Sequence, residues 1–276
     1  MNIDEHISAT RVRLCMVGDS GAGKTGSLAA LANAGYNLRV IDADAGLDIL
    51  SRSSLLTPEA RKRVHYVTFT DEVNLRGGVA CLDKFPQAAS QIQKFMKEWK
   101  TPTEDFGSVK DWGPDCIHVL DSGTFFGKYL MNFQRATNSR GNEAPWIQDY
   151  GAAMDTIEFC LDEFRGDKYK CHTIWTFHIT YQGDPLDKKL LRGYPSALGT
   201  KLPPKVGRYF NAILAVRSSG SGSAVRRVIR TTSESNMELK TPLVNIPTEI
   251  PMEIDKEGRA RGGLATYFNL VLKGTN

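Results

Sequence analysis

Short apolar runs alternate along the chain with segments in which apolar residues recur at helical spacing. The apolar runs are predicted as buried strands and lie at 11–17, 37–41, 64–69, 116–120 and 171–177. Amphipathic helices are predicted where apolar side chains recur every three or four residues, at 84–99, 125–133 and 147–164. Strands that alternate with helices predict an α/β fold with a mostly parallel central sheet, flanked by helices on both faces.

The C-terminal third has a different pattern. The segments 212–216 and 225–231 predict a hairpin across a turn rich in Gly and Ser, and 266–272 predicts an edge strand. These segments are expected to add antiparallel edge strands to the sheet. We therefore expect one domain over 1–240 and a C-terminal appendage over 241–276 that packs on it or trails from it. Loops are predicted where Pro, Gly and polar residues accumulate, at 100–114, 134–146 and 181–207.

A glycine-rich octapeptide joins the first predicted strand to the helix that follows it. Its residues, with the next glycine, are Gly18, Asp19, Ser20, Gly21, Ala22, Gly23, Lys24, Thr25 and Gly26. In this context the glycines turn the backbone N–H groups inward, and the helix N-terminus adds a partial positive charge. Lys24 can then reach the β- and γ-phosphates, and the Thr25 hydroxyl can bind Mg²⁺. The sequence therefore predicts a site for a nucleoside triphosphate, ATP, with Mg²⁺.

Further polar residues follow other predicted strands, at the edge where a parallel sheet forms its ligand crevice. Asp121 is expected to hold Mg²⁺ through water, a role compatible with capping the next helix. Asp42 and Asp44 follow another strand, and one of them is a candidate general base for water unless both are solvated turn acids. His178 follows a third strand and either faces the γ-phosphate or is structural.

The order of these motifs resembles the core of the RecA/RadA recombinases. Val40-Ile41-Asp42-Ala43-Asp44 is similar to the family's strand that ends in the catalytic base, a Glu in the family and Asp44 here. The strand ending in Asp121-Ser122 resembles the family's second nucleotide motif. The strand ending at His178 resembles the one whose last residue, a Gln in the family, senses the γ-phosphate. The resemblance spans about residues 11–216 and implies a RecA-like P-loop ATPase core with Lys24, Asp44 and His178 as catalytic residues.

The compact chain looks most like the small RecA-like ATPases of bacteriophages, which are associated with single-strand annealing and recombination. This resemblance implies single-stranded DNA as a partner, a homo-oligomer, contacts with phage recombination or replication proteins, and a location in the host bacterial cytoplasm. Five scattered cysteines without a CxxC pair also favour a reduced cytoplasmic setting over a zinc site. No stretch is long enough to cross a bilayer, so we expect no membrane partner.

Positive charge is concentrated in one part of the chain. The net charge is +4, whereas 180–240 alone holds eleven Lys or Arg against four Asp or Glu, a net charge of +7. The family's DNA-binding loops correspond to 134–146 and 181–207, so the resemblance implies that cations and an aromatic ring there bind DNA. The candidate residues are Arg140, Trp146, Lys188, Lys189, Arg192, Lys201, Lys205 and Arg208. A solvated basic face is the alternative interpretation.

Two other functions stay open at this point. One is a P-loop small-molecule kinase, in which 134–146 with Arg135 and Arg140 serves as the lid. The other is a non-hydrolysing nucleotide-dependent switch or assembly factor for phage particles. Asp44 favours that possibility, because Asp is one methylene shorter than the family's Glu.

Overall fold

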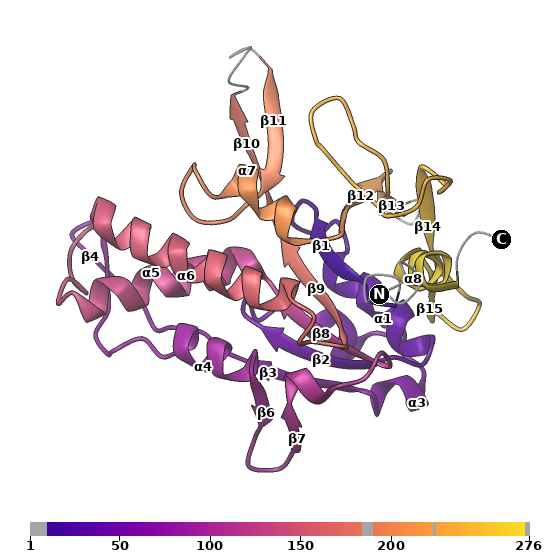
Figure 1. Cartoon of the computed structure of the whole chain (residues 1–276), viewed down its shortest axis with the longest axis horizontal. Coiled ribbons are helices and arrows are strands. Elements are labelled where there is room, and N and C mark those ends of the chain that lie inside the picture. The colour runs from indigo at the N-terminus through magenta and orange to yellow at the C-terminus, as the bar shows by residue number, and fades with distance from the viewer. Residues whose placement is uncertain (1–9, 184–189, 223–224, 274–276) are drawn as a thin grey trace.

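A computed structural model describes residues 10–183, 190–222 and 225–273. Nine strands of this part form one sheet in the order β15-β14-β13-β12-β1-β9-β8-β2-β3 (Figure 1). The parallel strands are β3 (Val64–Thr68), β2 (Asn37–Asp42), β8 (Cys116–Asp121), β9 (His172–Phe177), β1 (Arg13–Val17) and β12 (Ala212–Ser219). The antiparallel strands are β13 (Arg226–Arg230), β14 (Glu249–Ile254) and β15 (Ala260–Gly262). The predicted α/β class with a mostly parallel sheet and antiparallel C-terminal strands is confirmed.

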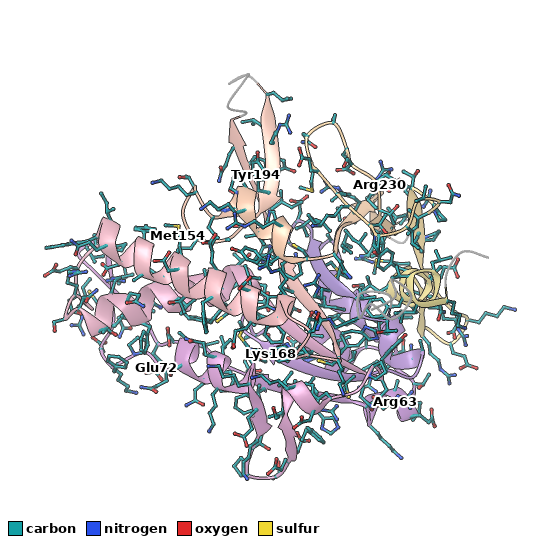
Figure 2. All side chains as sticks on the ribbon, viewed as in Figure 1. Arg63, Glu72, Met154, Lys168, Tyr194 and Arg230 are labelled. Atoms are coloured by element: carbon teal, nitrogen blue, oxygen red, sulfur yellow. The ribbon has the colours of Figure 1, made fainter. Side chains whose placement is uncertain are left out.

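Helices cover both faces of the sheet, and side chains fill the space between the layers (Figure 2). One face carries α1 (Lys24–Asn33), α2 (Asp48–Arg52), α3 (Pro58–Arg61) and α8 (Gly263–Lys273). The other carries α4 (Ala88–Phe95), α5 (Gly123–Thr137), α6 (Ile147–Arg165) and α7 (Pro203–Val206). Within β1, Leu14 and Met16 belong to the first core and Cys15 and Val17 to the second. This alternation explains why the central strands are rich in apolar residues on both faces and show no regular apolar–polar alternation.

Three hairpins lie outside the main sheet. They are β4 (Asn74–Arg76) with β5 (Val79–Cys81), β6 (Glu98–Lys100) with β7 (Asp105–Ser108), and β10 (Ile179–Gly183) with β11 (Leu191–Pro195). Short 3-10 turns lie at Val109–Asp111 and Gly207–Tyr209. Figure 1 shows the β10–β11 and β6–β7 hairpins projecting from opposite sides of the molecule. The loop predicted for 181–207 therefore contains a hairpin and a short helix, and the loop predicted for 100–114 contains a strand.

The helix predicted for 84–99 is too long. It spans only Ala88–Phe95 as α4, and Trp99 lies in strand β6. The ring of Trp99 still packs against Phe95, with their centroids 5.3 Å apart, and both side chains belong to the same core. The spacing alone predicted a longer helix because the β6–β7 hairpin folds back onto α4. The hairpin buries Trp99 where a further turn of the helix would have buried it.

The edge strand predicted for 266–272 is wrong, because this segment is part of helix α8. Leu264, Tyr267 and Phe268 are fully buried, and their spacing of three and four residues places them on one helical face against α1. Strand β14 also pairs with β13. The described part of 241–276 thus extends the sheet and the core of the preceding chain.

No helix in the described part of the chain has the length and apolar character needed to cross a membrane. All five cysteines lie in this part and are free thiols, four of them buried.

Candidate functional site

The predicted site residues come from the carboxyl ends of four adjacent strands. Strand β1 leads into Gly18, β9 into His178, β8 ends at Asp121, and β2 leads through Asp42 to Asp44. Since β9 lies between β1 and β8, His178 comes between the glycine-rich loop and Asp121. The sheet order therefore brings together residues that are far apart in the sequence.

The loop before α1 has the backbone of a phosphate cradle. Gly21 and Gly23 have φ angles of +76° and +106°, a region that favours glycine. The loop closes through a hydrogen bond from Ala22 N to Asp19 O of 3.2 Å. The Lys24 ammonium donates to the carbonyl oxygens of Gly18 (2.8 Å) and Asp19 (3.0 Å), so it lies across the loop. N–H groups at the start of α1 have no partner within the helix, which suits them to an anion.

Two oxygen ligands for a metal lie beside this loop. Thr25 Oγ1 donates a 2.6 Å hydrogen bond to Asp121 Oδ2, and Thr176 donates to the other oxygen of Asp121. Asp121 is 1% exposed and therefore held in one position. A hydroxyl and a carboxylate are hard oxygen ligands of the kind Mg²⁺ prefers. Thr25 and Asp121 thus fit the metal-holding roles predicted for them.

The two carboxylates after β2 differ in their surroundings. Asp42 accepts hydrogen bonds from Thr68 Oγ1 (3.0 Å) and Gly46 N (3.2 Å), so its role is to hold the turn. Asp44 Oδ1 is buried and has no hydrogen-bond partner among the described residues. Burial, with the negative charges of Asp121 and Asp42, raises the pKa of Asp44 to about 7. Of the two acids, Asp44 is the one placed to accept a proton.

His178 is a half-buried side chain on the wall of the same cavity. Burial, together with the positive charge of Lys24, lowers its pKa, so the imidazole is neutral at pH 7. Burial also lowers the pKa of Lys24, and the charges of Asp121, Asp44 and Asp19 oppose this effect. The His178 backbone N–H donates a 3.1 Å hydrogen bond to Thr124 Oγ1 at the start of α5.

A cavity of about 590 Å³ lies over the loop, within the range of small-ligand sites. One wall is lined by the loop, Gly26, Asp44 and His178. A second wall is lined by residues of β13, β14, β15 and α8, among them Arg227, Met252, Ile254 and Leu264. Nothing in the sequence predicted this second wall. No local motif marks it, because its residues reach the loop only through pairing of the C-terminal strands.

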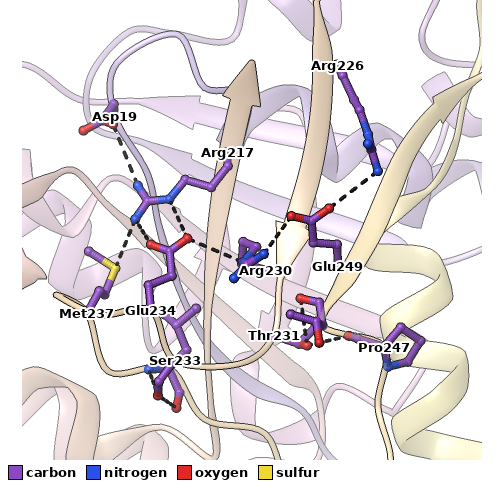
Figure 3. A network of polar contacts seen from close by, with 12 residues as sticks. Asp19, Arg217, Arg226, Arg230, Thr231, Ser233, Glu234, Met237, Pro247 and Glu249 are labelled. Atoms are coloured by element: carbon purple, nitrogen blue, oxygen red, sulfur yellow. Dashed lines mark hydrogen bonds and ion pairs between the residues drawn. The ribbon is translucent and has the colours of Figure 1, made fainter. Parts of the chain in front are cut away.

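A chain of ion pairs connects the loop to the C-terminal strands (Figure 3). It runs through Asp19, Arg217, Glu234, Arg230, Glu249 and Arg226. Arg217 lies 3.8 Å from Asp19 and forms a close ion pair with Glu234, and this contact lowers the pKa of Glu234. The three arginines of this ion-pair network are therefore each neutralised by a carboxylate.

Two predicted nucleic-acid residues lie together before α6. Arg140 forms an ion pair with Asp149, and its guanidinium lies 4.5 Å from the centre of the Trp146 ring. The Arg140 side chain is 14% exposed, whereas Trp146 is 54% exposed. Asp149 also accepts from the backbone N–H of Trp146, which caps the helix. Arg140 thus fixes the start of α6, and its contact with nucleic acid stays a prediction.

The other predicted cations follow β9. Lys188 and Lys189 lie outside the described residues. Carboxylates engage three of the rest: Arg192 with Glu238 (2.9 Å), Arg208 with Glu158 (2.9 Å) and Lys205 with Glu158 (3.9 Å). Lys201 is exposed. These pairs lie at the surface, where such contacts contribute little to stability.

Comparison with known proteins gives similarity to solved structures only. No protein-family model and no curated protein matches the chain. The RadB recombinase is 16% identical over 90% of this chain and 89% of its own, with a TM-score of 0.45. The flagellar accessory protein FlaH of Methanocaldococcus jannaschii is 10% identical over 91% of this chain and 88% of its own (0.44). A KaiC-like protein of Pyrococcus horikoshii OT3 is 9% identical over 91% of this chain and 88% of its own, with a TM-score of 0.43. At these values the similarity carries no functional argument.

Proposed function

We propose that the protein is a RecA-like ATPase that binds ATP with Mg²⁺ and uses it to control the binding of single-stranded DNA. One observation carries the nucleotide part: Lys24, the Thr25–Asp121 pair, Asp44 and His178 converge at the ends of four adjacent strands. A phosphate cradle, a metal-holding pair, a base and a contact for the terminal phosphate are the parts that triphosphate hydrolysis requires.

Each side chain then has a defined role. Lys24 and the loop N–H groups bind the β- and γ-phosphates. Thr25 and Asp121 hold Mg²⁺, which when bound neutralises charge on the phosphate oxygens. Asp44 takes the proton of the attacking water, because burial raises the pKa of its carboxyl and so makes it a better proton acceptor than an exposed Asp. Neutral His178 donates an N–H to an oxygen of the terminal phosphate.

The β10–β11 hairpin supports the DNA part of the proposal, because both of its strands connect to the nucleotide site. Strand β10 starts directly after His178, and Ser196, after β11, donates 2.7 Å to the His178 carbonyl. On β11, Gly193 N donates 2.7 Å to Asn236 O, next to Met237 and close to Glu234. Glu234 in turn pairs with Arg217, which reaches the phosphate loop. A change at the phosphates can therefore act on the hairpin from two sides.

The hairpin offers groups suited to single-stranded DNA. Tyr181 is 46% exposed and can stack on a base, and Arg192 can exchange its surface partner Glu238 for a phosphate. Together with the resemblance to small phage ATPases, this supports a role in annealing or recombination, with a homo-oligomer and other phage proteins as partners. The kinase alternative is weaker, because Arg140 pairs with Asp149 and is not free to act in a lid.

The decisive test is the rate of phosphate release from ATP with and without single-stranded DNA. We expect DNA to raise the rate. DNA affinity should fall on the order of tenfold to a hundredfold between 50 and 200 mM salt, because bound counterions are released. Lys24→Ala should remove nucleotide binding and leave the fold intact.

The proposal fails if DNA leaves the rate unchanged. It also fails if ADP forms only with an added small-molecule acceptor, which would indicate a kinase. Slow turnover that DNA does not raise, with a protein partner bound in one nucleotide state, would indicate the switch instead.

A further inference from the structure

We propose that Arg227, on the C-terminal strand β13, binds the phosphates of the nucleotide beside Gly23 of the glycine-rich loop. This inference rests on the proposed nucleotide site and names a further binding residue in it. Its ligand class is nucleoside di- and triphosphates.

The first observation is where the Arg227 side chain lies. A Cβ atom built on Gly23 would lie 2.8 Å from Arg227 Cδ and 3.1 Å from Arg227 Nε. The arginine stem therefore crosses directly over the residue that precedes Lys24. Gly23 has φ +106° and begins the turn into α1, where the loop N–H groups bind phosphate. Arg227 also lines the 590 Å³ cavity together with Lys24 and Thr25.

The second observation is the charge balance of the strand. Successive side chains on a strand point to opposite faces, so Arg226 and Arg230 share one face and Arg227 lies on the other. On the first face Glu249 pairs with both arginines (Figure 3). On the second face, among the described residues, no hydrogen bond or ion pair engages the Arg227 guanidinium. Arg227 is thus an exposed cation beside a phosphate cradle, without the carboxylate its neighbours have.

The third observation is the neighbour of Arg227 at the same point. Met252 Cε, from β14, would lie 3.6 Å from the same Gly23 Cβ. Met252 and Arg227 therefore lie side by side against Gly23, one apolar and one cationic. A guanidinium is suited to this place because its planar donors can bind two phosphate oxygens at once. Lys24 approaches from the loop, and Arg227 closes the site from above.

The test compares Arg227→Ala with the matched variant Arg226→Ala, which removes a neighbouring arginine of the same strand from the opposite face. Equilibrium binding of fluorescent ATP and ADP analogues is measured for both, with thermal melting to verify folding. Removing a charge-assisted contact should weaken both nucleotides about tenfold or more for Arg227→Ala. Arg226→Ala should bind like the unmodified protein. Arg227→Lys, which keeps the charge and loses the bidentate fork, should lie between them.

Each outcome decides the inference. Equal affinities for Arg227→Ala and Arg226→Ala would overturn it. If Arg227→Ala does not fold, Arg227→Lys with undiminished affinity would overturn it and an intermediate affinity would support it. The proposed function fails separately: in that case the unmodified protein does not bind ATP, or Lys24→Ala binds it equally well. If Lys24→Ala loses ATP binding and Arg227→Ala does not, the proposed ATP site is supported and only the role of Arg227 is excluded.

Discussion

Asp44 should destabilise the folded protein at the pH at which it works. Its carboxyl is partly buried, faces the charges of Asp121 and Asp42, and has one oxygen without a hydrogen-bond partner among the described residues. Replacing it in Asp44→Asn removes a charge that the folded state disfavours and keeps nearly the same shape. We therefore expect Asp44→Asn to have a higher free energy of unfolding than the unmodified protein at alkaline pH.

The magnitude follows from the pKa. A carboxyl raised from its ordinary value of 3.8 to about 7 corresponds to about 4 kcal/mol against the ionised form, at about 1.4 kcal/mol per pKa unit. Because the side chain is only partly buried, we halve this to about 2 kcal/mol. The folded protein holds this proton more tightly than the unfolded chain. The free energy of unfolding should therefore fall as pH rises from about 4 through about 7, and level off above that pH.

Urea unfolding without nucleotide or Mg²⁺ measures this effect. The advantage of Asp44→Asn should grow from below about 1 kcal/mol at pH 5 to about 2 kcal/mol at pH 8. Its ATPase rate should fall about a hundredfold or more, because the base is lost. Asp48→Asn is the control: its side chain is 74% exposed, so its effect should stay within about 0.5 kcal/mol at each pH. Equal or lower stability of Asp44→Asn at pH 8 would refute the reasoning.

Two further predictions concern the metal pair and the C-terminal helix. Thr25→Ala should reduce Mg²⁺ affinity about tenfold or more in a nucleotide-binding titration, whereas Thr25→Ser should keep it, because only the hydroxyl contacts Asp121. Equal loss in both variants would contradict this role. Phe268→Ala should lower the free energy of unfolding by about 3–5 kcal/mol, since the ring is fully buried against Tyr36 and His172, whereas Val244→Ala, 96% exposed, should have no measurable effect. An unchanged urea midpoint for Phe268→Ala would mean that α8 is not part of the core.

The parts of the fold that sequence predicted are those whose signal is local. The central strands are buried on both faces, so they lack the alternation of apolar and polar residues that marks a half-exposed strand; all six residues of β9 are buried, the polar His172, Thr173 and Thr176 included. The glycine-rich loop is one contiguous segment, and its backbone angles need glycine at Gly21 and Gly23. Placing Asp121, Asp44 and His178 at one edge required only the rule that parallel strands end at the same edge.

The parts that sequence did not predict depend on contacts between distant segments. Arg227 reaches Gly23 because β13 joins the sheet beside β12, and nothing in the sequence near Arg227 records this. Helix α8 contains Thr266, Tyr267, Phe268 and Val271, which also favour strands, and its packing on α1 decides its conformation. Pairing also separates Asp42 from Asp44, since Thr68 on the adjacent strand occupies the first and leaves the second available.

The β10–β11 hairpin rests on two supports, the residues after β9 and the loop around Met237. A hairpin anchored at one point can pivot about that point. A hairpin anchored at two points can rotate as a rigid body only when the two points move relative to each other. Small rearrangements that displace both supports together would translate the hairpin without reorienting it. A rotation of the described strands β10 and β11 as one body therefore alters the spacing between β9 and the segment that carries Glu234, and a pair of spectroscopic labels on those two elements would register that change directly.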